Sequence, residues 1–336
     1  MRGNYILSLI MTSLVDLLTL LPNKDWDFQE LSRNSNITWK FIKANPDKPW
    51  NYPILSGNPA ITWDIIKANP DSRGSPANKT WNYYPSAEYP DMKPNLDKNF
   101  HIVGFCENPN FVMKAIQEKP YWSWNYHVLS SNPAITMDIV KANPDSYVNN
   151  NVSFANKPWD YRELSKNPNI TMDIVKANPS DGWDYDVLSQ NPNITWEIIK
   201  ANPNKPWNLR TFCNNPNITE EFIKSTPDES LDYRNLSRNP AIRWEFIKAT
   251  LEKNWSYQIL SKNPAITLDI IKANLDKPWY LPLLATNPSV TYDVVKANPW
   301  MKWDYDQLST NPSITCDDVK NNLDKPWNFK FLSKHL

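Results

Sequence analysis

The sequence has little glycine, cysteine or histidine, and each shortage excludes a class of site. Only 5 glycines occur among 336 residues, which excludes glycine-rich loops that bind phosphate groups through backbone amides. The 3 cysteines are too few and too widely spaced for a disulfide framework or a zinc cluster, and the 3 histidines are equally scattered. We therefore expect no metal and no cofactor.

The chain also lacks an excess of either charge. Lysine plus arginine and aspartate plus glutamate number 36 each, so the formal net charge is zero. A general electrostatic attraction to nucleic acid or to an anionic membrane is not expected for such a chain.

The longest apolar run lies near the N-terminus, in MRGNYILSLIMTSLVDLLTLLPNKDW, and has two interpretations. A basic residue before an apolar run is typical of a secretory signal, but Asp16 interrupts the run and no cleavage pattern follows. The run is also too short to span a bilayer. Because Leu17 and Leu18 match Ile198 and Ile199 of the repeat described next, we interpret residues 5–21 as a capping helix within an N-terminal segment 1–25. A signal or anchor is the alternative.

Proline and tryptophan are abundant, at 30 and 17 residues, because one unit recurs. The stretch WDYDVLSQNPNITWEIIKANPNKP begins at Trp183, and Trp207 begins it again 24 residues later. The array covers residues 26–336, with an irregular unit at 81–99, insertions near 71–80 and 145–157, and half a unit at the end. Units begin at Trp26, Trp50, Trp81, Phe100, Trp124, Trp159, Trp183, Trp207, Leu231, Trp255, Trp279, Trp303 and Trp327.

Each unit, numbered from its tryptophan as position 1, predicts two short helices. Asp184 and Thr195 are favourable N-caps, and the Asn-Pro pairs at 191–192 and 202–203 end the helices because the residue before proline avoids the helical region. Helices this short are unstable alone and must stack on their neighbours. The sequence therefore predicts an all-α fold, an α-solenoid of about twelve helix-turn-helix repeats, and by simple stacking a rod of about 100 Å or more.

The predicted core consists of the positions that stay apolar in every copy. Position 12 is Ile, Val or Phe, position 17 is Ile or Val, and position 6 is nearly always Leu or Phe. Position 7 is small, so Cys106 and Cys213 are interpreted as packing residues in place of serine. Leu231 replaces the tryptophan and is expected to be a weak point in the stack.

The units NPNITWEIIKANPNKPW and NPAITLDIIKANLDKPW resemble the tandem tryptophan and Asn-Pro repeats of proteins encoded by mimivirus-like giant DNA viruses of amoebae. The resemblance covers residues 26–336 and implies a location in the host cytoplasm, with the virion as the alternative. That family has no agreed activity. The unit at Trp81 departs from the pattern, so the resemblance does not establish that the superhelix is continuous at that point.

Position 14 varies in type while staying mostly large, and it supplies the candidate partner-binding stripe. The alternative is contact between successive repeats. The stripe consists of Trp39, Trp63, Met137, Met172, Trp196, Trp244, Leu268 and Tyr292.

Lysine at position 18 supplies a candidate charged rim beside the stripe. It is either a basic track for an acidic partner or a solvated face paired with the acidic position 15 three residues earlier. The rim consists of Lys43, Lys67, Lys141, Lys176, Lys200, Lys248, Lys272 and Lys296.

No catalytic residue is predicted, because every polar residue type is distributed evenly along the array rather than converging at one place. The sequence favours a non-catalytic scaffold that binds a protein partner, with position 14 and the two insertions setting specificity. Flexible excursions are the alternative for the insertions. Two other functions stay open: a structural component of the virus particle that contacts like copies end to end, and a membrane-anchored or secreted form.

Overall fold

The computed structural model describes residues 13–68, 103–110, 112–118, 124–142 and 159–336. Within these ranges the regular elements are 24 α-helices and two short 3₁₀ turns, without a strand, so the predicted all-α repeat fold is confirmed. Both predicted insertions, the irregular unit at 81–99 and residues 5–12 of the predicted N-terminal helix lie outside the described residues.

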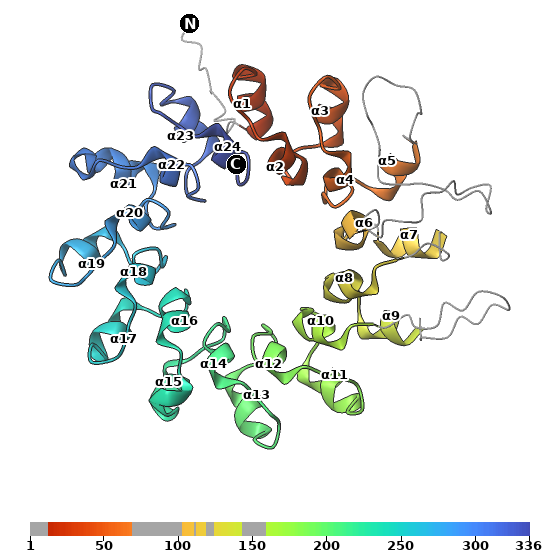
Figure 1. The fold of residues 1–336 in the computed structure, drawn as a ribbon, viewed down its shortest axis with the longest axis vertical. Coiled ribbons are helices and arrows are strands. Elements are labelled where there is room, and N and C mark those ends of the chain that lie inside the picture. Colours follow the sequence, from red (N-terminus) through yellow and green to blue (C-terminus); the bar gives the residue numbers. More distant parts are fainter. Residues whose placement is uncertain (1–12, 69–102, 111, 119–123, 143–158) are drawn as a thin grey trace, which may run out of the picture.

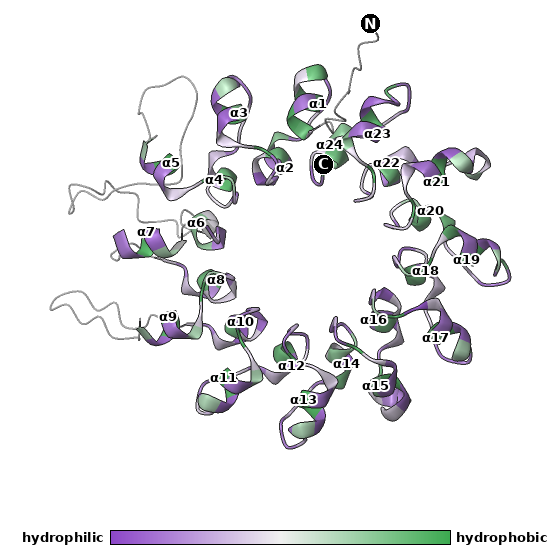
Figure 2. Ribbon diagram, turned by 180° about the vertical axis from the view of Figure 1, so that it is seen from behind, coloured by the Kyte–Doolittle hydropathy of each residue, from purple (hydrophilic) through white to green (hydrophobic). Residues whose placement is uncertain are grey.

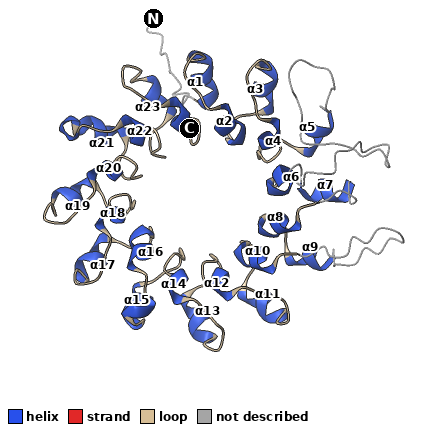
Figure 3. Cartoon of the chain, viewed as in Figure 1, coloured by secondary structure: helices blue, strands red, loops and turns tan. Residues whose placement is uncertain are grey.

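The helices form a closed ring, and the rod expected from stacking is wrong (Figures 1 and 3). The even-numbered helices make the inner wall and the odd-numbered helices the outer wall, so each unit contributes one of each. Every unit is rotated slightly from the one before it, and this small rotation accumulates around the array. The twelve pairs thereby bring the two ends of the chain together.

Most inner helices are one turn long. They are α2 (Phe28–Arg33), α4 (Tyr52–Leu55), α6 (Val103–Glu107), α8 (Tyr126–Ser131), α10 (Tyr161–Lys166), α12 (Tyr185–Leu188), α14 (Leu209–Phe212), α16 (Tyr233–Arg238), α18 (Tyr257–Leu260), α20 (Leu281–Leu284), α22 (Tyr305–Leu308) and α24 (Phe329–Leu332).

The outer helices are slightly longer. They are α1 (Leu14–Leu20), α3 (Trp39–Ala44), α5 (Trp63–Ala68), α7 (Val112–Glu118), α9 (Met137–Ala142), α11 (Met172–Ala177), α13 (Trp196–Ala201), α15 (Glu220–Ser225), α17 (Trp244–Ala249), α19 (Leu268–Lys272), α21 (Tyr292–Ala297) and α23 (Cys316–Lys320). The 3₁₀ turns are η1 (Asp228–Ser230) and η2 (Pro299–Met301).

In the unit at Trp183 both helices begin at the predicted caps and α13 ends before Asn202 as predicted, whereas α12 ends at Leu188, before the predicted end at Asn191. The Asp184 carboxylate accepts a hydrogen bond from the Val187 amide at 3.0 Å, which caps α12. The Thr195 hydroxyl accepts from the Ile198 amide at 3.4 Å and caps α13. After α12, the side-chain oxygen of Asn191 accepts from the Asn193 amide at 2.9 Å, an Asx-turn that leads the chain to the outer helix.

The core lies between the two walls. The position 6 side chains of the inner helices, among them Leu164, Leu188 and Phe212, are fully buried. The described residues at positions 12 and 17, such as Ile194 and Ile199, are buried as well, so the predicted core is confirmed. Hydrophobic residues recur in this way in pair after pair around the ring (Figure 2).

A buried asparagine at position 9 joins each unit to the one before it. The Asn215 amide group donates to the backbone carbonyls of Ser189 at 2.9 Å, Asn191 at 2.9 Å and Ile194 at 3.0 Å. These carbonyls belong to the preceding unit, and without Asn215 the Ser189 carbonyl would be buried without a donor, which is costly. The same side chain also makes the Asx-turn, so one residue both shapes its own unit and binds its neighbour.

Two further contacts recur at most regular junctions. The Ser189 hydroxyl accepts from the Asn208 amide of the next unit at 3.1 Å. The ring of Tyr185 packs edge-on against Trp207 with centroids 5.0 Å apart. The Trp207 indole in turn donates to the Asn202 carbonyl at 2.9 Å, which fixes the turn before it.

The ring closes through these same contacts, made between opposite ends of the sequence. The Asp27 amide donates to the Ser333 hydroxyl at 3.0 Å, and Asn34 donates to the Ser333 carbonyl at 3.2 Å. Trp26 packs edge-on against Phe329 at 4.9 Å. The outer helix α1 contacts α23. α24 and α1 therefore form one unit, whose inner helix comes from residues 327–336 and whose outer helix comes from the N-terminal segment.

The stack is continuous across the irregular unit. Asn108 donates to the carbonyls of Ser56 at 3.2 Å and Asn58 at 2.8 Å, the same bonds that consecutive units make elsewhere. α6 therefore packs directly on α4, and the described helices continue the superhelix from the unit at Trp50 to the unit at Phe100.

The cysteines at position 7 serve as packing residues, as predicted. Cys106 and Cys213 are fully buried. The Cys213 thiol donates to the Leu209 carbonyl at 3.4 Å and accepts from the Asp232 amide at 3.3 Å, which are the bonds that serine makes in other units.

We expect Leu231→Trp to stabilise the ring by about 1 kcal/mol, because the indole would add buried aromatic area beside α14. It would also bring a donor toward the Thr226 hydroxyl, which is buried without a hydrogen-bond partner among the described residues. In the next unit Trp255 donates to the equivalent Thr250 carbonyl at 3.0 Å and hydroxyl at 3.3 Å. Thermal unfolding measures the change, and a lower melting temperature would show that the site cannot accept the ring.

Candidate functional site: the inner wall of the ring

The structure places the position 14 stripe between successive outer helices rather than on a surface. Trp63, Met137, Met172, Trp244, Leu268 and Tyr292 are buried, and Trp39 and Trp196 are half-buried. The Trp196 ring packs 5.0 Å from Phe222 of the next outer helix. These side chains are thus contacts between repeats, and a partner could reach them only by separating the outer helices.

Truncation of a stripe residue is accordingly expected to destabilise the protein. Trp244 is 9% exposed, and its ring lies 5.8 Å from Trp279. We expect Trp244→Ala to lower the free energy of unfolding by about 3 kcal/mol or more, as large-to-small core substitutions do. Chemical denaturation measures this loss. An unchanged midpoint would instead favour the surface stripe.

The rim lysines are all exposed on the outer wall. In those that form a described ion pair, a carboxylate largely neutralises the lysine charge. Lys296 pairs with Asp293 at 2.8 Å, three residues earlier on its own helix. Lys67 lies 3.4 Å from Asp64, and Lys200 reaches Glu221 of the next outer helix at 2.6 Å. Lys200 and Lys296 also lie 5.8 and 5.7 Å above the rings at position 14, which their stems cover.

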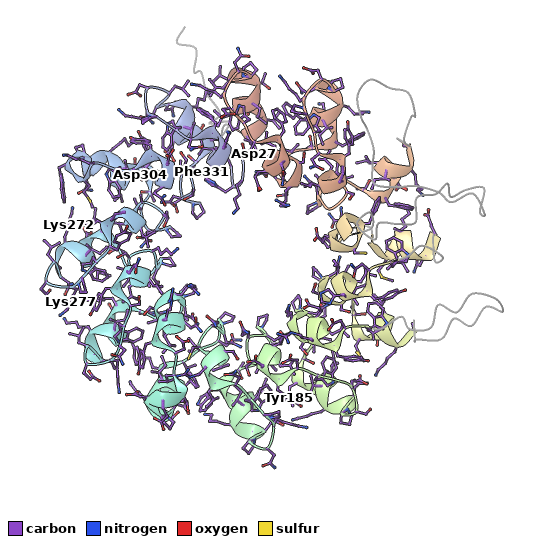
Figure 4. The ribbon with its side chains drawn as sticks, viewed as in Figure 1. Asp27, Tyr185, Lys272, Lys277, Asp304 and Phe331 are labelled. Carbon is purple, nitrogen blue, oxygen red and sulfur yellow. The ribbon has the colours of Figure 1, made fainter. Side chains whose placement is uncertain are left out.

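The inner wall is a second candidate surface. The buried Leu or Phe at position 6 of each inner helix faces the core. Positions 4 and 8, the latter at the end of the helix or in the turn after it, lie on the opposite side because successive helical residues are 100° apart. These positions therefore face the centre of the ring. The described side chains leave that centre open in Figure 4, where the labelled Phe331 lies on the inner side and the labelled Lys272 on the outer side.

The inner wall is chemically varied, unlike the core. Its uncharged members include glutamine, proline, serine, threonine, asparagine and histidine. Three acidic residues, Glu107, Asp186 and Asp306, are exposed on it. Nine basic residues, all exposed, complete its charges: Arg33, Arg162, Lys166, Arg210, Arg234, Arg238, Lys262, Lys330 and Lys334.

A pocket of about 400 Å³ lies beside this wall where Leu231 replaces tryptophan. Arg210 and Arg234 of the inner wall contribute to its lining. Behind them Asp228 accepts hydrogen bonds from Lys253 at 2.5 Å and from the Tyr233 hydroxyl at 3.0 Å. The hydrogen bond from Lys253, followed by the one from Tyr233, holds the pKa of Asp228 below its usual value.

The two cysteines at position 7 are not activated as nucleophiles. Burial raises the pKa of the Cys106 thiol to about 12 and that of Cys213 to about 11, so both are protonated at neutral pH. No group of three or more His, Cys, Asp or Glu side chains there could hold a metal ion.

The inner wall was not predicted from the sequence, because the prediction relied on residue types that recur from unit to unit. Positions 4 and 8 do not repeat, and their role depends on the ring, which gives a common centre to side chains from units far apart in sequence. The sequence signal that could have identified these positions is their variability. Position 6 stays Leu or Phe, whereas position 4 differs between the units at Trp183, Trp207 and Leu231, where it is Asp186, Arg210 and Arg234.

Among the residues that the structure describes, no helix has the length and apolar character needed to cross a bilayer. Comparison of the chain with protein-family models, with curated proteins and with solved structures found no match in any of the three.

Proposed function

We propose that this protein is a non-catalytic scaffold whose inner wall binds a protein partner in the cytoplasm of a virus-infected host cell. The observation that supports it is a division between two sets of residues. The repeated residues form the ring's own core and junctions, as Asn215 and Trp207 do, whereas the variable residues at positions 4 and 8 face the centre. A surface that varies on a rigid repeated frame suits the recognition of one partner. The cellular location rests on the resemblance to giant-virus repeats.

The closed ring bears on the alternative function, a structural component of the virus particle. End-to-end contact between like copies needs an unpaired helix pair at each end of an array. Here the ends are paired with each other, since Asn34 binds Ser333. Assembly of that kind would require the ring to open.

A steric change inside the ring tests the proposal. Gln190→Trp and Thr310→Trp, made together, place bulky uncharged side chains at two exposed inner positions that are remote from the core. We expect this variant to lose the partner that the unmodified ring retains in affinity capture from infected cells. Lys176→Trp and Lys248→Trp on the outer wall form the matched control and should retain it. Equal capture by both variants would place the binding surface elsewhere.

A further inference from the structure

The inner wall carries an excess of positive charge although the chain as a whole is neutral. In the described units, nine exposed basic residues and three exposed acidic residues occupy positions 4 and 8. On the outer wall, by contrast, Lys296 pairs with Asp293 and Lys67 with Asp64, so opposite charges alternate. Charge is therefore separated between the two walls, and a low-dielectric wall around an open centre concentrates the resulting field.

The arrangement of the basic residues also lowers helix stability, because some of them repel one another. Like charges stand four residues apart at Arg162 with Lys166 on α10 and Arg234 with Arg238 on α16, and again at Lys330 on α24 with Lys334 just after it. Such pairs destabilise a helix by a few tenths of a kcal/mol. The fold relieves some of this repulsion, because Arg162 lies 3.5 Å from Asp184 and Lys330 lies 3.1 Å from Asp25.

One arc of the wall has no such relief. Arg210 lies on α14, Arg234 and Arg238 lie on α16, and Lys262 lies in the turn that follows α18; these are consecutive inner helices. Among the described residues, none of Arg234, Arg238 and Lys262 forms an ion pair with a carboxylate. Arg210 instead donates to the Glu229 carbonyl at 3.3 Å. Asp186 and Asp306 lie outside this arc on either side of it.

We propose that the basic arc formed by Arg210, Arg234, Arg238 and Lys262 binds an acidic polypeptide segment. This inference rests on the proposed function and specifies the chemistry of the partner. Guanidinium groups suit it because they bind carboxylates through two parallel hydrogen bonds. Inner helices about 10 Å apart make the arc roughly 20 to 30 Å long, which an extended peptide of about eight residues would span.

The arc fits a peptide better than a nucleic acid. Sequence-independent binding of single strands uses aromatic side chains on which bases stack, and the described residues at positions 4 and 8 include no Phe, Tyr or Trp. A duplex needs a long uninterrupted basic track, but Asp186 and Asp306 bound the arc at both ends. The pocket beside Leu231 adds a recess that Arg210 and Arg234 border, large enough for one peptide side chain.

Fluorescence anisotropy with labelled decaglutamate tests the inference on the full chain. We expect saturable binding that weakens with added salt and falls about tenfold or more in Arg234→Glu with Arg238→Glu. Lys176→Glu with Lys248→Glu alters the same charge on the outer wall and should change affinity less than about twofold if the arc is the site. Circular dichroism verifies that both variants keep their helices.

Three outcomes would overturn the inference: no binding of decaglutamate to the unmodified ring at low salt, equal weakening by the outer variant, or tighter binding of oligothymidylate than of decaglutamate.

The test separates this inference from the proposed function. If the tryptophan variants lose their partner while decaglutamate does not bind, the partner occupies the wall by other chemistry. If decaglutamate binds the arc but those variants still capture the partner, the proposed function fails.

Discussion

Deletion of residues 327–336 is expected to open the ring and to cause the largest loss of stability of any change considered. The segment buries Trp327, Phe329, Leu332 and Leu336 in the unit that it shares with α1. At about 1.5 kcal/mol or more for each buried side chain, the lost hydrophobic contribution is about 6 kcal/mol. It also exposes Trp26 and the closing face of α2, which Ser333 and Phe329 contact.

Small-angle scattering and circular dichroism should show this change together. Because each unit depends mainly on its neighbours, the remaining array is expected to keep most of its helix while its radius of gyration increases. Lys334→Ala, an exposed substitution in the same segment, is the control and should leave both quantities unchanged. An unaltered radius of gyration after the deletion would show that the ring does not depend on the split unit.

The second large effect is expected at the buried asparagines. Asn215→Leu leaves the buried Ser189 carbonyl without a donor. It also removes one of two donors from the Asn191 carbonyl, which keeps the Ile194 amide, and from the Ile194 carbonyl, which keeps the Asn217 side chain. The Asn217 backbone amide loses its acceptor, 2.8 Å away. Since each group left unsatisfied costs about 1 kcal/mol or more and two further hydrogen bonds are lost, the free energy of unfolding should fall by about 3 kcal/mol or more.

The neighbouring residue provides a matched control for this prediction. Asn214 is exposed at position 8 of the same unit, so Asn214→Leu should change the unfolding free energy by less than about 0.5 kcal/mol. Urea denaturation of the two variants measures the difference. Equal effects would mean that the asparagine column does not hold the units together.

The sequence predicts the repeat, the core and the ends of the helices because these are local properties. The apolar residues at positions 6, 12 and 17 and the caps at Asp184 and Thr195 act within a unit, and every copy repeats the same signal. The asparagine of the Asn-Pro pair is recognisable as a helix end and a turn. Its second role, as donor to the preceding unit, depends on stacking geometry that one unit does not show.

The ring could not be predicted because closure depends on a small angle. Twelve units must each turn by about 30°, and a change of a few degrees per unit would give an open superhelix instead. Two features of the sequence were consistent with closure: the half unit after Trp327, and the match of Leu17 and Leu18 to the outer-helix positions of Ile198 and Ile199. Together they amount to one complete unit.

The candidate site was misplaced for a related reason. Large side chains at position 14, such as Trp196 and Tyr292, predict either a surface stripe or contacts between repeats, and composition alone does not distinguish these. The outer helices lie close enough to bury Tyr292 and to half-bury Trp196. Glu220 is tolerated there because it is exposed and pairs with Lys224 at 3.1 Å.

The central claim is that opposite ends of the sequence meet as consecutive units of one ring. A distance between spin labels tests it most directly, with cysteines introduced at Arg33 and Lys334, which occupy position 8 on either side of the closure. Arg238 and Lys262 occupy the same position in two consecutive internal units and serve as the reference pair. Serine, which other copies carry at position 7, replaces Cys106 and Cys213 in the labelled protein, and Cys316 is likewise replaced.

We predict the same short distance, about 10 Å between backbones plus the label arms, for the closure pair and the reference pair. A closure distance that is much longer than the reference distance, up to the roughly 100 Å of an open stack, would contradict the ring.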